Sequence, residues 1–149
     1  MSLRENLDVL TRVAEVATLA GIKGHIDEDA MHFQAGFSLN GNRSQTVYIR
    51  PTGKTPAGKS VVTIFSPCLI VESGFLKGLS KAKVIELLTQ NENILFARFG
   101  LVTTPSGQMI VASVDHLLDT LDPEELHDSM WFVAFAADSE EEKLKQDNF

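Results

Sequence analysis

The chain has 149 residues, of which 44% are hydrophobic, and its formal net charge is −7. A chain of this length fits one domain, and its hydrophobic content excludes disorder over most of its length, so we expect residues 1–149 to fold around a single core. The excess of acidic residues creates a field that repels phosphate backbones, so nucleic acid is not an expected partner.

We expect neither a secretory signal nor a membrane-spanning segment in this sequence. Arg4, Glu5 and Asp8 interrupt the first residues, which therefore lack the apolar centre of a secretory signal. The longest apolar run, residues 130–137, is much shorter than the roughly 20 residues that cross a bilayer. Cys68 is the only cysteine, which agrees with a reducing compartment. We therefore expect a cytoplasmic protein without membrane association.

Residues 3–20 carry apolar side chains at helical spacing. Leu3, Leu7 and Leu10 follow one another at intervals of four and three, which keeps them on one face of a helix. Gly21 stands where a glycine commonly ends a helix in the left-handed conformation. The pattern predicts a first helix that packs against a sheet.

Residues 31–39 alternate between apolar and polar side chains, which is typical of a strand with one face in water. The Asn-Gly-Asn sequence at 40–42 tolerates positive φ, so we expect a tight reversal into a second strand at 45–50. Phe33 and Phe37 would then line the inner face of this antiparallel hairpin.

A loop and a third strand are expected next. Residues 51–58 contain two prolines and two glycines and predict an exposed loop. Residues 60–71 are apolar at both odd and even positions, which indicates a strand covered on both faces. Pro67 has no N–H for the ladder, so this strand either ends near Ser66 or has an edge or a bulge there.

A second helix and a second hairpin follow. Ser80 is a suitable N-cap, and Val84 and Leu87 continue at helical spacing. Residues 95–103 and 108–114 predict two strands, joined by a Pro-Ser-Gly turn.

The last helix has the strongest start signal in the chain. Asp122 is an N-cap residue, Pro123 suits the first helical position, and acidic residues follow at the positive end of the helix dipole. We expect this helix to end at about residue 144. Its apolar run at 130–137 surrounds the whole helix, so one face would pack on the sheet and the opposite face would expose aromatic surface.

Together these elements give the order α-β-β-β-α-β-β-α. The predicted fold class is therefore α+β, with an antiparallel sheet flanked by helices.

The sequence shows no pattern that points to catalysis or metal binding. Cys68 has apolar neighbours, which is typical of a small core residue with little reactivity. The acidic segments around His116 and His127 lack the paired-histidine or Cys-x-x-Cys spacing of zinc sites. We therefore expect no catalytic residue, no cofactor and no metal.

Three stretches carry a family resemblance: Leu-Leu-Thr-Gln-Asn at 87–91, Phe-Gly-Leu at 99–101, and Gly107 leading into Ile110 and Val111. With the element order and the acidic charge, the chain resembles the type III secretion chaperone-like fold over residues 3–144. Within that fold it is similar to the bacterial sensory-transduction-regulator, or YbjN-like, group. Its long, apolar final helix departs from the secretion-chaperone pattern.

The resemblance implies a curved antiparallel sheet flanked by helices, commonly in a homodimer. In secretion chaperones this fold binds an extended segment of a client protein, and it is known for binding and not for catalysis. Fold analogy alone is an associational argument for function.

Our leading hypothesis is a non-enzymatic, chaperone-like or regulatory module that acts as a homodimer and binds a protein or peptide through apolar surface and strand edges. The candidate interface residues are Trp131, Phe132, Phe135, Phe33 and Phe37. One alternative is a small ligand-binding domain or enzyme with a pocket between sheet and helices, using His32 or His116. Another is an assembly subunit whose only role is to dimerise.

Overall fold

A computed structural model of the chain describes residues 1–71, 79–105 and 107–146. These described residues form three helices, six strands and two short 3-10 turns. The helices are α1 (Leu3–Leu19), α2 (Lys81–Gln90) and α3 (Pro123–Gln146). The strands are β1 (Gly24–Asp27), β2 (His32–Ser38), β3 (Ser44–Lys54), β4 (Ser60–Val71), β5 (Arg98–Thr104) and β6 (Gly107–Leu117), and the turns are η1 (Asn40–Asn42) and η2 (Leu118–Thr120).

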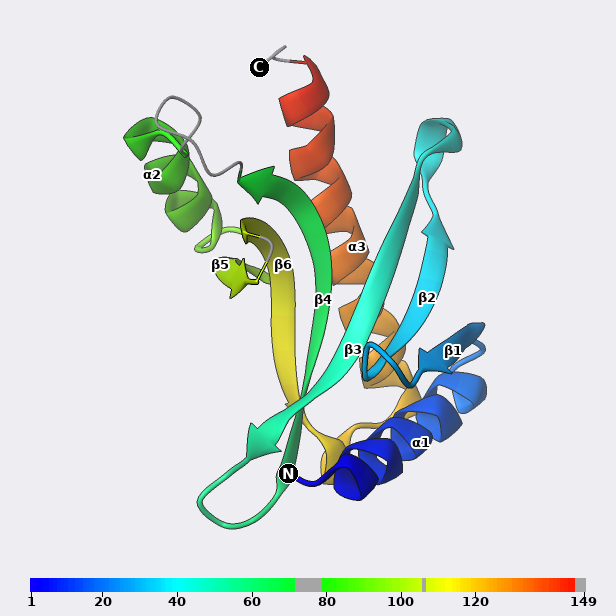
Figure 1. Cartoon of the computed structure of the whole chain (residues 1–149). Coiled ribbons are helices and arrows are strands. Elements are labelled where there is room, and N and C mark those ends of the chain that lie inside the picture. Colours follow the sequence, from blue (N-terminus) through cyan, green and yellow to red (C-terminus); the bar gives the residue numbers. More distant parts are fainter. Residues whose placement is uncertain (72–78, 106, 147–149) are drawn as a thin grey trace.

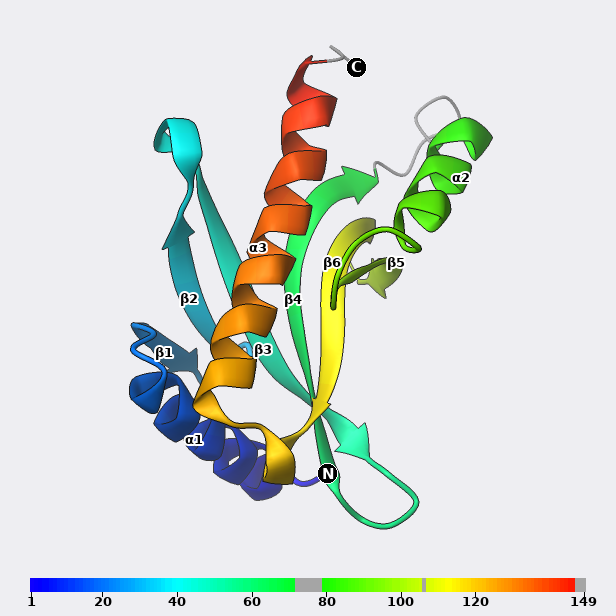
Figure 2. The ribbon, with the colours of Figure 1, turned by 180° about the vertical axis from the view of Figure 1, so that it is seen from behind.

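The six strands form one antiparallel sheet in the order β1-β2-β3-β4-β6-β5. The helices lie on one face of this sheet: α3 runs behind the long central strands in Figure 1 and in front of them in Figure 2, where the molecule is seen from behind. No described helix covers the opposite face. This arrangement confirms the predicted α+β class with an antiparallel sheet flanked by helices.

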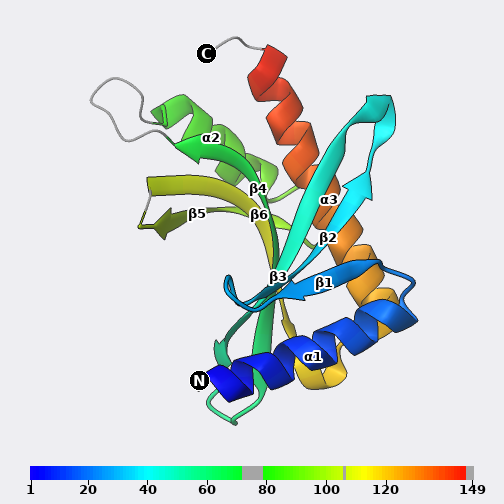
Figure 3. The same cartoon turned by 45° about the vertical axis from the view of Figure 1, so that its right-hand side comes forward.

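Helix α1 starts at a capping box. The backbone N–H of Glu5 donates to Ser2 Oγ at 3.2 Å, and the backbone N–H of Ser2 donates to Glu5 Oε2 at 2.7 Å. The bond to the Ser2 backbone, followed by the bond to Lys54, lowers the pKa of Glu5 to about 2. Lys54 thereby links α1 to β3, and Figure 3 shows α1 running beside β1 across the lower part of the molecule. The buried face of α1 consists of Val9, Leu10, Val13, Val16 and Ala17.

Two prolines lie within long strands. The predicted loop at residues 51–58 is wrong in its first part, because β3 continues through Pro51 to Lys54 with a register shift between Pro51 and Gly53. A bulge accommodates a residue that has no N–H to donate. Strand β4 spans the predicted residues and does not end at Ser66; of the alternatives left open for Pro67, the register shift between Pro67 and Leu69 fits the bulge.

Strand β1 was not predicted. It has four residues, none of them buried, and it pairs with β2 at one edge of the sheet. Gly24 is required there: a Cβ at this position would lie 2.5 Å from the backbone oxygen of Gln34 and would also collide with the Phe33 ring. Strand β2 therefore lies closer to Gly24 than it could to a residue with a side chain.

The core lies between the covered face of the sheet and helices α1 and α3. The N–H of Glu125 donates to Asp122 Oδ1 at 2.7 Å, which confirms the predicted cap of α3. Five apolar α3 side chains facing the sheet are completely buried: Leu126, Met130, Val133, Ala134 and Ala137.

Replacing Gly24 with alanine should destabilise the fold by about 1–3 kcal/mol, because the new methyl group overlaps the β2 backbone. Urea unfolding followed by circular dichroism measures this loss. Gly36→Ala is the matched control, since a Cβ there meets no atom within 4 Å and the stability should hardly change. Equal stability of the two variants would contradict the close approach of β1.

Candidate protein-interaction surface

The structure places Phe33 and Phe37, two of the candidate interface residues, in the core. Their side chains are 2% and 6% exposed. The Phe37 ring meets the Trp131 ring edge to face, with 4.8 Å between the ring centroids. Phe33 and Phe37 therefore pack against the chain's own helices and offer no surface to a partner.

The three aromatic residues of α3 are covered to different extents. Trp131 is partly buried beneath Phe37, and its Nε1 donates to His127 Nε2 at 3.1 Å. Phe132 stacks on Phe96, with 5.3 Å between the ring centroids. Phe135 is 52% exposed and is the most accessible of the three. The aromatic surface expected on this helix is thus reduced mainly to Phe135.

A larger apolar surface lies on α2, on the segment that follows it, and on β5. Six of the eleven exposed large apolar side chains among the described residues fall between positions 84 and 101. We call them the α2–β5 surface: Val84, Ile85, Leu88, Leu95, Phe96 and Leu101. Figure 1 shows α2 and β5 together at one end of the sheet, away from α1.

The short helix α2 explains part of this exposure. It begins at Ser80, whose Oγ accepts from the N–H of Lys83 at 3.1 Å, as the sequence predicted. Leu87 is the one side chain that α2 buries, although Val84, Ile85 and Leu88 are also apolar. A helix of ten residues with four large apolar side chains has more of them than one packed face can cover.

Strand β5 supplies an open edge beside these side chains. The amide of Asn91 satisfies both backbone groups of Phe99: Oδ1 accepts from its N–H at 2.7 Å, and Nδ2 donates to its C=O at 3.2 Å. Backbone direction alternates along an antiparallel strand, so the N–H and C=O of Leu101 and Thr103 point to this same free edge, and those of Val102 point to β6. No hydrogen bond from another described segment reaches the backbone of Leu101 or Thr103.

The β5 edge is nearly uncharged in a strongly acidic protein. Residues 93–114 contain one charged side chain, Arg98, whereas the whole chain has a net charge of −7. Arg98 Nη1 donates to the carbonyl oxygens of Ile94 at 3.0 Å and Ala97 at 2.7 Å. The side chains of this edge therefore add little repulsion between two copies of this chain.

An ion pair between Lys83 and Glu140 attaches α2 to α3. Glu140 is 1% exposed, and Lys143 Nζ lies 3.7 Å from its Oε2. Burial lowers the pKa of Lys83, but the hydrogen bond and charge of Glu140, followed by those of Glu86, outweigh burial and raise the pKa above its ordinary value. The position of the α2–β5 surface thus depends on this pair.

Serine, histidine and glutamate side chains also meet in space. His116 Nε2 lies 2.8 Å from Ser129 Oγ, and His116 Nδ1 lies 3.6 Å from Glu125 Oε1. These are the residue types of a hydrolytic triad. Ser129 is 0% exposed, however, because it lies on the α3 face that packs against the sheet. No substrate reaches its hydroxyl in this structure, and the contact links β6 to α3.

The remaining candidate groups do not form a reactive centre. Burial, followed by the charge of Glu140, raises the pKa of Cys68 to about 12, which leaves a neutral thiol. His32, the other histidine considered for a pocket, contacts Gln34 and the Tyr48 ring on the uncovered face of the sheet. The described part of the chain contains no cluster of three metal-ligating side chains, and none of its helices is long and apolar enough to cross a membrane.

Comparison with known proteins found no matching family model and no matching curated protein.

Removing the Glu140 carboxylate tests the attachment of α2. Glu140→Ala removes the buried partner of the Lys83 ammonium and leaves it the exposed Glu86 carboxylate at 3.3 Å, so the change should cost about 1–3 kcal/mol, whereas the same change at exposed Glu142 should cost little. Because the Lys83 pKa is raised in the folded state, the pair stabilises fully below the ordinary pKa of 10.5, and this stabilisation is lost as pH rises through the folded value. Urea unfolding across this pH range measures both effects. Similar losses in the two variants would contradict the ion pair.

Proposed function

We propose that this protein is a non-enzymatic protein-binding module that acts as a homodimer, with two copies meeting at the α2–β5 surface. The observation that carries the proposal is the concentration of exposed apolar side chains beside an open, nearly uncharged strand edge. Apolar patches of this kind mark interaction sites, since monomeric proteins usually keep them small.

The β5 edge suits a second copy of itself. Two antiparallel strands related by a two-fold axis present the same donors and acceptors to each other, so the outward-facing groups of Leu101 and Thr103 can pair across the axis. The side chains of α2 would then pack at the flank of the joined sheets. The opposite edge, β1, is less suited, because it has four residues and includes Asp27.

The same chemistry supports a chaperone-like or regulatory role. Apolar surface and strand edges are the features through which a sheet captures an extended segment of another protein. The resemblance of the chain to the type III secretion chaperone-like fold favours this role, since that fold is known for binding proteins. Phe135 on α3 is 52% exposed beside Trp131 and would be available to a client. A reduced, buried Cys68 is in keeping with a cytoplasmic location.

Sedimentation velocity from micromolar to near-millimolar concentration tests the homodimer. The native chain should change from one copy to two as concentration rises, and Leu101→Asp should raise the dissociation constant by about 100-fold or more, because it places a charge in the apolar contact. Thr103→Pro should have a similar effect, since it removes an outward-facing N–H and leaves the β6 ladder intact.

Leu19→Asp is the matched control for these variants. Leu19 is 75% exposed on α1, and Figure 1 shows α1 far from α2 and β5, so the same substitution there should leave the dimer unchanged. Circular dichroism confirms that each variant is folded. A native chain that stays a single copy at near-millimolar concentration would overturn the proposal.

A further inference from the structure

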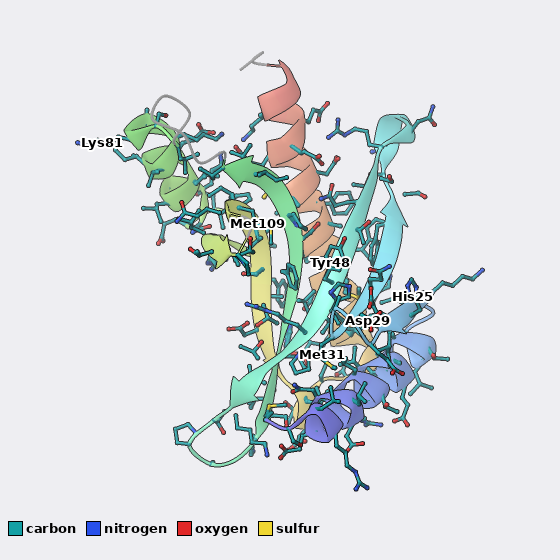
Figure 4. All side chains as sticks on the ribbon, in the orientation of Figure 1. His25, Asp29, Met31, Tyr48, Lys81 and Met109 are labelled. Atoms are coloured by element: carbon teal, nitrogen blue, oxygen red, sulfur yellow. The ribbon has the colours of Figure 1, made fainter. Side chains whose placement is uncertain are left out.

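The uncovered face of the sheet contains a hollow of about 130 Å³. It crosses the sheet from β3 to β5 on the face turned toward the viewer in Figure 1, and Met109, labelled in Figure 4, lines it. One end of the hollow is polar and its floor is apolar. Its polar lining includes Arg50, Thr63 and Ser113, and its apolar lining includes Phe65, Val111 and Met109.

Arg50 brings an unpaired positive charge to this hollow. Its guanidinium carbon lies 5.5 Å from the centroid of the Phe65 ring. Phe65 in turn stacks on Tyr48, also labelled in Figure 4, with 5.4 Å between the centroids. Within the described ranges no carboxylate lies within ion-pair distance of Arg50. The aromatic pair therefore positions a guanidinium that has no ion-pair partner among the described residues, while the Asp115 carboxylate on the same face is bonded to Thr63.

The hydroxyl groups beside Arg50 differ in their availability. Thr63 Oγ1 donates to Asp115 Oδ1 at 2.6 Å and is also hydrogen-bonded to Thr52, so it is already occupied. The hydroxyl of Ser113 has no hydrogen-bond partner among the described residues. Ser113 is opposite Phe65 in the ladder, which places it next to the ring that Arg50 covers.

We propose that this hollow binds a small monocarboxylate with about four to six carbons. Arg50 would take the carboxylate, the Ser113 hydroxyl would donate to it, and the hydrocarbon body would lie on Phe65, Val111 and Met109. The size fits, because an apolar cavity of about 150 Å³ takes up a benzene molecule. The charge fits as well, since the Arg50 cation has no ion-pair partner among the described residues. A ligand this small, in an open hollow, should bind with a dissociation constant on the order of 1 mM.

An NMR titration at neutral pH with three probes tests this proposal. Hexanoate has both the carboxylate and the body, acetate lacks the body, and 1-hexanol lacks the carboxylate. Hexanoate should cause saturable shifts of the amide signals of Val111 and Ser113, and the other two probes should bind at least about tenfold more weakly. Absence of saturable shifts with hexanoate, or equal binding of the three probes, would overturn the proposal.

Arg50→Met should weaken hexanoate binding at least about tenfold, because it keeps the length of the side chain and removes its charge. Arg4→Met is the matched control, since Arg4 is exposed on α1 and lies outside the hollow. Unchanged binding in Arg50→Met would contradict the site. Sedimentation of Arg50→Met keeps the two proposals separate, because the homodimer depends on the α2–β5 surface and should be unaffected.

Discussion

The structure depends on the packing of α3 against one face of the sheet. The apolar segment of this helix presents Met130, Val133 and Ala137 to the central strands, where all three are completely buried. Burial of this contact removes a large apolar area from water and holds β3, β4 and β6 in one layer. With the helices on a single face, the second face and the β5 edge are left to solvent or to a partner.

Because the helices cover one face of the sheet, polar groups on that face are buried and polar groups on the other face remain accessible. Ser129 and His116 meet at the covered face, so their hydroxyl and imidazole groups serve packing. Arg50 stands on the uncovered face, where its charge remains accessible. The short helix α2 lies at the margin of the covered layer, held by Leu87 and by the pair between Lys83 and Glu140, and its other apolar side chains are exposed. Both proposed surfaces are therefore consequences of how the helices are distributed.

Much of the fold could be predicted because its signals are local. The caps at Ser80 and Asp122 and the alternation in β2 are properties of neighbouring residues, and the structure confirms them. Strand β1 has no such pattern, since its pairing is made possible by the close approach at Gly24. A loop was expected to begin at Pro51, but a bulge accommodates this residue within β3.

The surfaces were harder to predict because they depend on contacts between distant segments. The apolar run of α3 indicated exposed aromatic side chains, but Phe37 and Phe96 cover two of them. Phe96 adopts a φ of 60°, a left-handed conformation that is uncommon for a large side chain, while its ring stacks on Phe132. The exposure of α2 could be predicted in part, because this helix has more apolar residues than one packed face can bury. The open edge at Leu101 could not be predicted from local residues, because it depends on the order of the strands in the sheet.

The most direct test of the account is amide hydrogen exchange in β5, measured by NMR at several protein concentrations. If two copies pair through β5, the outward-facing N–H groups of Leu101 and Thr103 should exchange rapidly in dilute protein and become protected as the copies pair, whereas the N–H of Val102, which faces β6, should be protected throughout. Rapid exchange at Leu101 and Thr103 in a solution where sedimentation shows two copies would contradict pairing through this edge.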